Sequence, residues 1–183
     1  MTDDVLQDPG PAAPDGADWT WVLTRPCPDC GFDAAHLGRD QIPELLQDAK
    51  RRYAAVLGQG EVRARPASGV WSPLEYSCHV RDVCVVMTAR LEQILDGCGR
   101  VVTFADWDQD RAAANGRYWR SDPTAVQQEV TDAFDAAAAA YARPVEGEWA
   151  WPALRSNGSR FTAETLARYF LHDVRHHLWD VRG

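Results

Sequence analysis

This sequence contains almost no lysine and no long apolar run. Lys50 is the single lysine among 19 basic residues, and 27 acidic residues leave a net charge of −8. Binding to a nucleic-acid backbone rests on clustered Lys and Arg, so this balance argues against DNA or RNA as a partner. No apolar run reaches the roughly 18 residues that a membrane-spanning helix needs, so we expect no membrane partner.

The first residues also lack the basic start and apolar core of a secretory signal. They are acidic and rich in Pro, Gly and Ala. We therefore expect residues 1–18 to be a disordered tail, residues 19–183 to form a single domain, and the protein to be cytoplasmic. The five cysteines are an odd number, which favours reduced thiols over a disulfide framework.

Segments of strand-like alternation are absent too, whereas four segments show the spacing of amphipathic helices. The second is the best delimited, because Ser72, Pro73 and Glu75 form a capping box with proline at the first helical position. Long connections at 58–71 and 98–120 separate the helices, the latter with room for a short helix. The fold expected is all-α, a four-helix bundle with long crossover connections. The expected helices run from about Asp40 to Leu57, from Pro73 to the GCG at 97–99, from Pro123 to before Pro144, and from about Thr162 to Val181.

The last helix carries three of the five histidines. His172 and His176 are four residues apart, so they share one face and could bind one metal ion, with His79 of the second helix as third ligand. Asp173 or Asp180 could orient such ligands from outside, or could simply be solvated or paired with arginine. The neighbouring His177 falls on the aliphatic stripe of the helix and is expected to be structural.

These residues resemble the DinB/YfiT-like superfamily of four-helix-bundle metalloproteins over roughly residues 40–182. The resemblance implies a divalent ion, Zn or Ni, held by three such residues with coordination positions open. Many members have a double histidine whose second member is the ligand, so His177 is the alternative to His176. The two diagnostic parts are W-S-x-x-E-x-x-x-H and H-x-x-x-H, represented by Trp71, Ser72, Glu75, His79, His172 and His176.

A second local motif is the CxxC of Cys27-Pro28-Asp29-Cys30-Gly31. Its proline and glycine are typical of a zinc knuckle, which presents two thiolates to one ion. A structural site needs four ligands, and we consider Cys27, Cys30 and His36 with one more ligand. A redox pair and a simple turn with buried thiols are the alternatives.

An ion with open positions suits activation of a bound water or thiol. Characterised members of the family include enzymes that use mycothiol or bacillithiol, and the Arg and Ala bias of this chain fits a GC-rich source that would use mycothiol. The resemblance therefore implies a metal-dependent thiol S-transferase acting on a small electrophilic substrate. A non-catalytic metal- or small-molecule-binding module and a metal-dependent hydrolase are the alternatives, and a homodimer is left open. We expect the ligand-binding residues to include Tyr169, Trp179 and Arg168, with Trp107 and Arg160 as further candidates.

Overall fold

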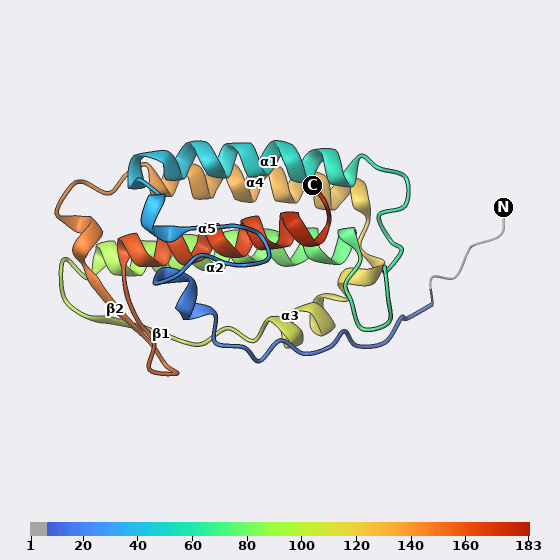
Figure 1. The fold of residues 1–183 in the computed structure, drawn as a ribbon, viewed down its shortest axis with the longest axis horizontal. Helices are drawn as coiled ribbons and strands as arrows, with labels where there is room; N and C mark the ends of the chain where they lie inside the picture. Colours follow the sequence, from blue (N-terminus) through green and yellow to red (C-terminus); the bar gives the residue numbers. More distant parts are fainter. Residues whose placement is uncertain (1–6) are drawn as a thin grey trace.

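The computed structural model describes residues 7–183, and four long helices dominate it. Helices α1 and α4 lie side by side, as do α2 and α5, and the two pairs pack on each other (Figure 1). This arrangement confirms the expected four-helix bundle. The bounds of the four helices are Ile42–Leu57 for α1, Pro73–Asp96 for α2, Pro123–Tyr141 for α4 and Ala163–Asp180 for α5.

The start of α2 has the predicted capping box. The backbone N–H of Glu75 donates to the Ser72 hydroxyl, and the Glu75 carboxylate accepts from the backbone N–H of Ser72. The Glu75 carboxylate also accepts a hydrogen bond from Arg65 Nε at 2.9 Å, in a side-chain pair that is almost wholly buried. Asp122 caps α4 and Thr162 caps α5, both by accepting from a backbone N–H three residues on.

Large side chains from all four helices fill the core. Tyr53 of α1 stacks on Phe134 of α4, with ring centroids 5.8 Å apart, and Tyr141 of α4 packs on Phe170 of α5 at 5.5 Å. The buried phenol of Tyr141 donates to the carbonyl of Met87, so its hydroxyl is satisfied inside the core.

A small three-stranded sheet, which the sequence did not predict, lies at one end of the bundle. Strand β1 (Val102–Phe104) pairs in parallel with β2 (Pro152–Arg155), and β2 pairs antiparallel with β3 (Arg160–Thr162). The Asn157-Gly158 turn joins β2 to β3, as its turn signal indicated, with Gly158 at φ +95°. Strands of three or four residues are too short to show a recognisable alternation of apolar and polar residues. The connection 98–120 also contains the short helix α3 (Gln109–Gly116), which was foreseen.

The segment before the bundle is placed against it. Residues 7–18 run past α3, and Ala13 donates a backbone hydrogen bond to the carbonyl of Gly69 (Figure 1). Five short 3₁₀ helices follow along the chain: η1 (Trp19–Leu23), η2 (Ala34–His36), η3 (Arg39–Gln41), η4 (Tyr118–Arg120) and η5 (Glu148–Ala150). Residues 1–6 of the expected tail lie outside the described residues, and the division into tail and single domain stays a prediction. Within residues 7–183, no helix combines the length and the apolar character needed to cross a membrane.

Candidate metal centre

Three potential metal ligands converge where α2 faces α5. His79 lies on the second turn of α2 with its side chain fully buried, while Asp173 and His177 are one turn apart on α5. His79 Nε2 is 3.4 Å from Asp173 Oδ1, and His177 Nε2 is 3.8 Å from the same oxygen. One ligand atom from each residue lies within 4.8 Å of the other two. We call these three residues the bundle cluster.

Aromatic and acidic neighbours hold the bundle cluster in place. The ring of Trp107 stacks on His79 at 5.5 Å, and that of Trp71, just before the α2 cap, packs on it at 5.2 Å. His177 Nδ1 donates to the Asp180 carboxylate at 2.8 Å, and Nε2 on the other side of the ring faces Asp173 of the cluster. In this structure Asp180 therefore orients His177, and not His176 as the sequence suggested.

Several polar atoms of the bundle cluster are buried and lack a hydrogen-bond partner among the described residues. Both ring nitrogens of His79 and Oδ1 of Asp173 make no hydrogen bond with any residue in 7–183. Leaving such atoms unsatisfied costs about 1–3 kcal/mol each, so a buried group of them needs an explanation. Imidazole nitrogen and carboxylate oxygen are ligands for divalent metals, and the residues present fit such an ion.

The charge states of His79 and Asp173 suit the same purpose. Burial lowers the pKa of His79, which keeps its imidazole neutral. Burial opposes the charge on Asp173, but the neighbouring His79 and His177 outweigh it and lower the pKa of that carboxyl. Burial likewise opposes the charge on His177, and the hydrogen bond to Asp180 reverses the effect and raises its pKa. A neutral imidazole and a carboxylate are the forms that bind metal, so His79 and Asp173 are already in those forms, whereas an ion would have to displace a proton that His177 holds more tightly.

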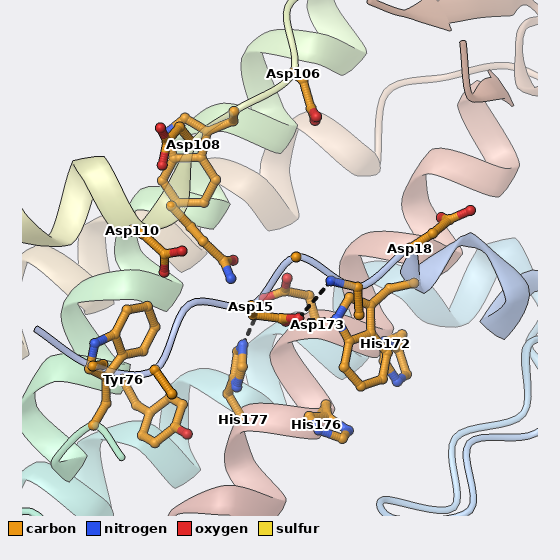
Figure 2. A pocket seen from close by; sticks show the side chains of 18 of the residues that line it. Asp15, Asp18, Tyr76, Asp106, Asp108, Asp110, His172, Asp173, His176 and His177 are labelled. Atoms are coloured by element: carbon orange, nitrogen blue, oxygen red, sulfur yellow. Dashed lines mark hydrogen bonds and ion pairs between the residues drawn. The ribbon is translucent and has the colours of Figure 1, made fainter. Parts of the chain in front are cut away.

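A cavity of about 640 Å³ opens beside the bundle cluster (Figure 2). Its charged lining is strongly acidic, and Arg155 is the one arginine or lysine among the described residues that line it. Aromatic faces also border it, including Trp19, Trp71 and Tyr169. The seven acidic residues are Asp15, Asp18, Asp106, Asp108, Asp110, Asp173 and Asp180, of which the first two come from the segment before the bundle.

His172 and His176 belong to a different group. Their ring nitrogens gather with the thiols of Cys27 and Cys30, one ligand atom from each lying within 4.8 Å of the others. The structure thus brings His172 and His176 together as expected, but it places His79 with Asp173 and His177 instead. The reason is rotation along α5: successive residues are about 100° apart, so the pairs 172/176 and 173/177 form adjacent stripes that face different partners.

Asp173 was expected only as an outer partner and not as a ligand, and His177, expected to be structural, was the alternative to His176 as ligand. The available signal was the spacing D-x-x-x-H at 173 and 177, which is as good an i, i+4 pair as H-x-x-x-H. Metal binding by either group stays a prediction.

The other expected residues lie as follows. Tyr169 and Trp107 line the cavity. Trp179 is 52% exposed and packs on His176, with ring centroids 5.7 Å apart. Arg168 donates to the carbonyl of Leu37 and to Glu164, away from the cavity wall. Arg160 is exposed on β3, and the side chain of His36 is 84% exposed and paired with Asp33.

Comparison with known proteins agrees with this architecture. A family model described as DinB superfamily matches residues 42–181. Among solved structures, the chain is similar to YfiT from Bacillus subtilis, described as a probable metal-dependent hydrolase with an unusual four-helix bundle topology. The TM-score is 0.68 at 12% identity, covering 77% of this chain and 82% of that one, so the likeness concerns the fold. No curated protein matches the chain.

Proposed function

Because the chain belongs to the DinB superfamily, we propose that it is a metal-dependent enzyme whose divalent ion is held by His79, Asp173 and His177. The observation that carries this proposal is the bundle cluster itself, which has three ligand atoms within 4.8 Å, one on the buried His79 and two on partly buried residues that line the cavity. Three protein ligands leave at least one coordination position for a substrate atom. A bound ion would supply Lewis acidity, which lowers the pKa of a thiol or water.

The reaction we favour is thiol S-transfer. In it a low-molecular-weight thiol loses its proton, its sulfur forms a bond to an electrophilic carbon, and the leaving group departs with the bonding electron pair. The carboxylates that line the cavity can accept the proton. The rings of Trp71 and Trp107 cover His79 and keep water away from it.

The charge of the cavity favours one class of thiol. Seven carboxylates against one arginine repel a thiol that itself carries carboxylates. The same carboxylates accept hydrogen bonds from hydroxyl groups, and the faces of Trp19 and Tyr169 can pack on the apolar face of a sugar ring. An uncharged, polyhydroxylated thiol of the mycothiol type therefore suits the site better than an anionic one such as bacillithiol.

A metal-dependent hydrolase is the second candidate. It is favoured by the description of the similar YfiT structure as a probable metal-dependent hydrolase. Water would take the place of the thiol, and the carboxylates of the cavity would accept its proton.

One experiment separates these functions. Protein loaded with Zn or Ni is incubated with a bimane or aryl-halide electrophile, with mycothiol, with bacillithiol and with no thiol. We expect faster conjugation with mycothiol near neutral pH, little with bacillithiol, and loss of the gain after chelation. His79→Ala and His177→Ala should abolish it. Cys98→Ser, which changes an exposed thiol just after the far end of α2, should leave the conjugation rate unchanged.

The other outcomes reassign the function. Turnover of an ester or amide panel without thiol would support the hydrolase. Metal binding at the bundle cluster with no turnover of either kind would make the protein a binding module.

A further inference from the structure

We propose that Cys27, Cys30, His172 and His176 form a second metal site, a closed structural zinc site that ties the segment before α1 to helix α5. This site uses none of the residues of the bundle cluster, and it stands whether or not the chain is an enzyme. We call it the Cys-His site.

The CxxC half of the site is already folded as a knuckle. Gly31 donates its N–H to the carbonyl of Cys27 at 3.0 Å, and Cys27 donates to the carbonyl of Phe32 at 2.8 Å. Gly31 has φ +69°, a conformation that glycine adopts without strain. This tight turn brings both thiols to one side, where an ion can meet them.

The histidine half comes from a stripe of α5 that faces this turn. Cys27 Sγ lies 3.6 Å from His176 Nδ1, although 149 residues separate them in the chain. Tetrahedral zinc with usual Zn–S and Zn–N bonds places sulfur and nitrogen about 3.5 Å apart. All four ligand atoms lie within 4.8 Å of one another, so small side-chain shifts complete the tetrahedron.

The number of ligands and the packing around two of them are those of a structural site, although Cys30 and His176 are only partly buried and both histidines border the cavity. Cys27 and His172 are 1% and 3% exposed, and the ring of Trp19 packs on His172 at 5.5 Å and on His176 at 5.0 Å. Phe32 covers His172 from another side at 5.5 Å. Four protein ligands leave no open position for a substrate.

An unsatisfied polar atom in the Cys-His site also indicates a bound ion. His172 Nε2 is buried and has no hydrogen-bond partner in the described part of the chain. His36, six residues after Cys30, is not part of the group, because its ring is exposed and paired with Asp33.

Closing the Cys-His site would fix one wall of the cavity. Trp19 packs on both histidine ligands, and Asp15 accepts a hydrogen bond from Trp19 Nε1 at 2.7 Å. Asp15, Asp18 and Trp19 all line the cavity (Figure 2). The structural ion would thus hold the segment that carries them.

Cobalt titration of the metal-free, reduced protein tests the proposal directly. Thiolate bound to Co²⁺ gives a near-ultraviolet charge-transfer band, and the bundle cluster contains no cysteine. We expect this band, with the strong visible bands of tetrahedral cobalt, in the wild type and in His79→Ala. The double variant Cys27→Ser, Cys30→Ser should lose the band and one zinc per chain. The matched controls Cys98→Ser and His36→Ala should keep both.

A ligand exchange guards against a variant that fails to fold. His176→Cys should still bind one zinc at this site, and its charge-transfer band should grow because three thiolates replace two. The proposal is overturned if the wild type shows no thiolate band, if the double variant keeps its zinc, or if His36→Ala loses it.

Hydrogen exchange measures the structural role. Chelation in the His79→Ala background should raise exchange at residues 19–36 and leave α4 unchanged. Unchanged exchange at 19–36 would overturn the claim that the ion holds this segment.

Discussion

The hydrogen bond from His177 to Asp180 is the contact most easily tested at the scale of single residues. The carboxylate fixes which nitrogen of His177 carries the proton and so which nitrogen faces Asp173 and His79. In metal sites, removal of such an outer partner typically lowers metal affinity by about 10- to 100-fold.

We therefore predict that Asp180→Ala weakens binding of the ion at the bundle cluster by about 10- to 100-fold without unfolding the protein. Competition with a chelator of known affinity measures this. Because the Cys-His site would also bind zinc, the titration is best done in the Cys27→Ser, Cys30→Ser background. Asp96→Ala, which removes an exposed carboxylate at the end of α2, is the matched control. Equal affinities in the two variants would rule out an orienting role for Asp180.

Helix α2 depends at its start on a buried ion pair. Burial alone would raise the pKa of Glu75, but the hydrogen bonds from Arg65 and from Ser72 outweigh it and lower that pKa below its ordinary 4.5. A carboxyl whose pKa is lower in the folded state stabilises the fold above its unfolded pKa, and this contribution is lost as pH falls through the folded value.

We predict that Glu75→Gln lowers the free energy of unfolding by about 1–3 kcal/mol near pH 7, because Arg65 then loses its charged partner. The difference between variant and wild type should shrink as pH falls from the unfolded pKa of Glu75 through its lower folded pKa, since Glu75 then becomes protonated in the folded wild type as well. Urea unfolding at several pH values measures this. Glu44→Gln, an exposed acid in the first turn of α1, should differ from wild type by less than about 0.5 kcal/mol at every pH. A Glu75 effect that is independent of pH would contradict the ion-pair explanation.

The elements that the sequence predicted well are those that carry their own boundary signals. Ser72, Pro73 and Glu75 mark the start of α2, and Asp122 and Thr162 mark those of α4 and α5. The strands β1 to β3 carry no such signal: β1 pairs with a segment about 50 residues away, and of the local β2–β3 pair only the Asn157-Gly158 turn was visible in the sequence. Local propensity has little weight in strands this short.

The sequence predicted which two helices form the site, but not which face of α5 contributes the ligands. The sequence pointed to α2 and α5, and His79 does lie at their contact. Which stripe of α5 meets His79 depends on how α5 is rotated against α2, and two adjacent i, i+4 pairs fit the sequence equally well. The partners of His172 and His176 lie some 149 residues away, a distance that no local pattern spans.

At the scale of the whole molecule, the Cys-His site would close a very long loop. An ion that binds only the folded chain adds stability by mass action, about 2.7 kcal/mol at a concentration 100 times its dissociation constant. We predict that zinc raises the unfolding midpoint of the wild type and that chelation lowers it. In the Cys27→Ser, Cys30→Ser variant the shift of the unfolding midpoint should be smaller, because zinc can no longer stabilise the fold through the Cys-His site. Equal responses in thermal unfolding would mean that the bundle cluster alone stabilises the fold.

The two adjacent stripes of α5 also bear on how the protein would sort metals. The pair 172/176 meets thiolates, which are soft ligands that prefer zinc, whereas the pair 173/177 offers imidazole and a hard carboxylate oxygen, which also suit nickel or manganese. A step of one residue along a single helix thus separates two sites of different softness. The same rigid element could carry a permanent ion on one side and an exchangeable one on the other. In a cell where available metals vary, the four-ligand thiolate site would retain zinc, while the three-ligand bundle cluster, with its open coordination position, would exchange its ion for whichever suitable metal is available.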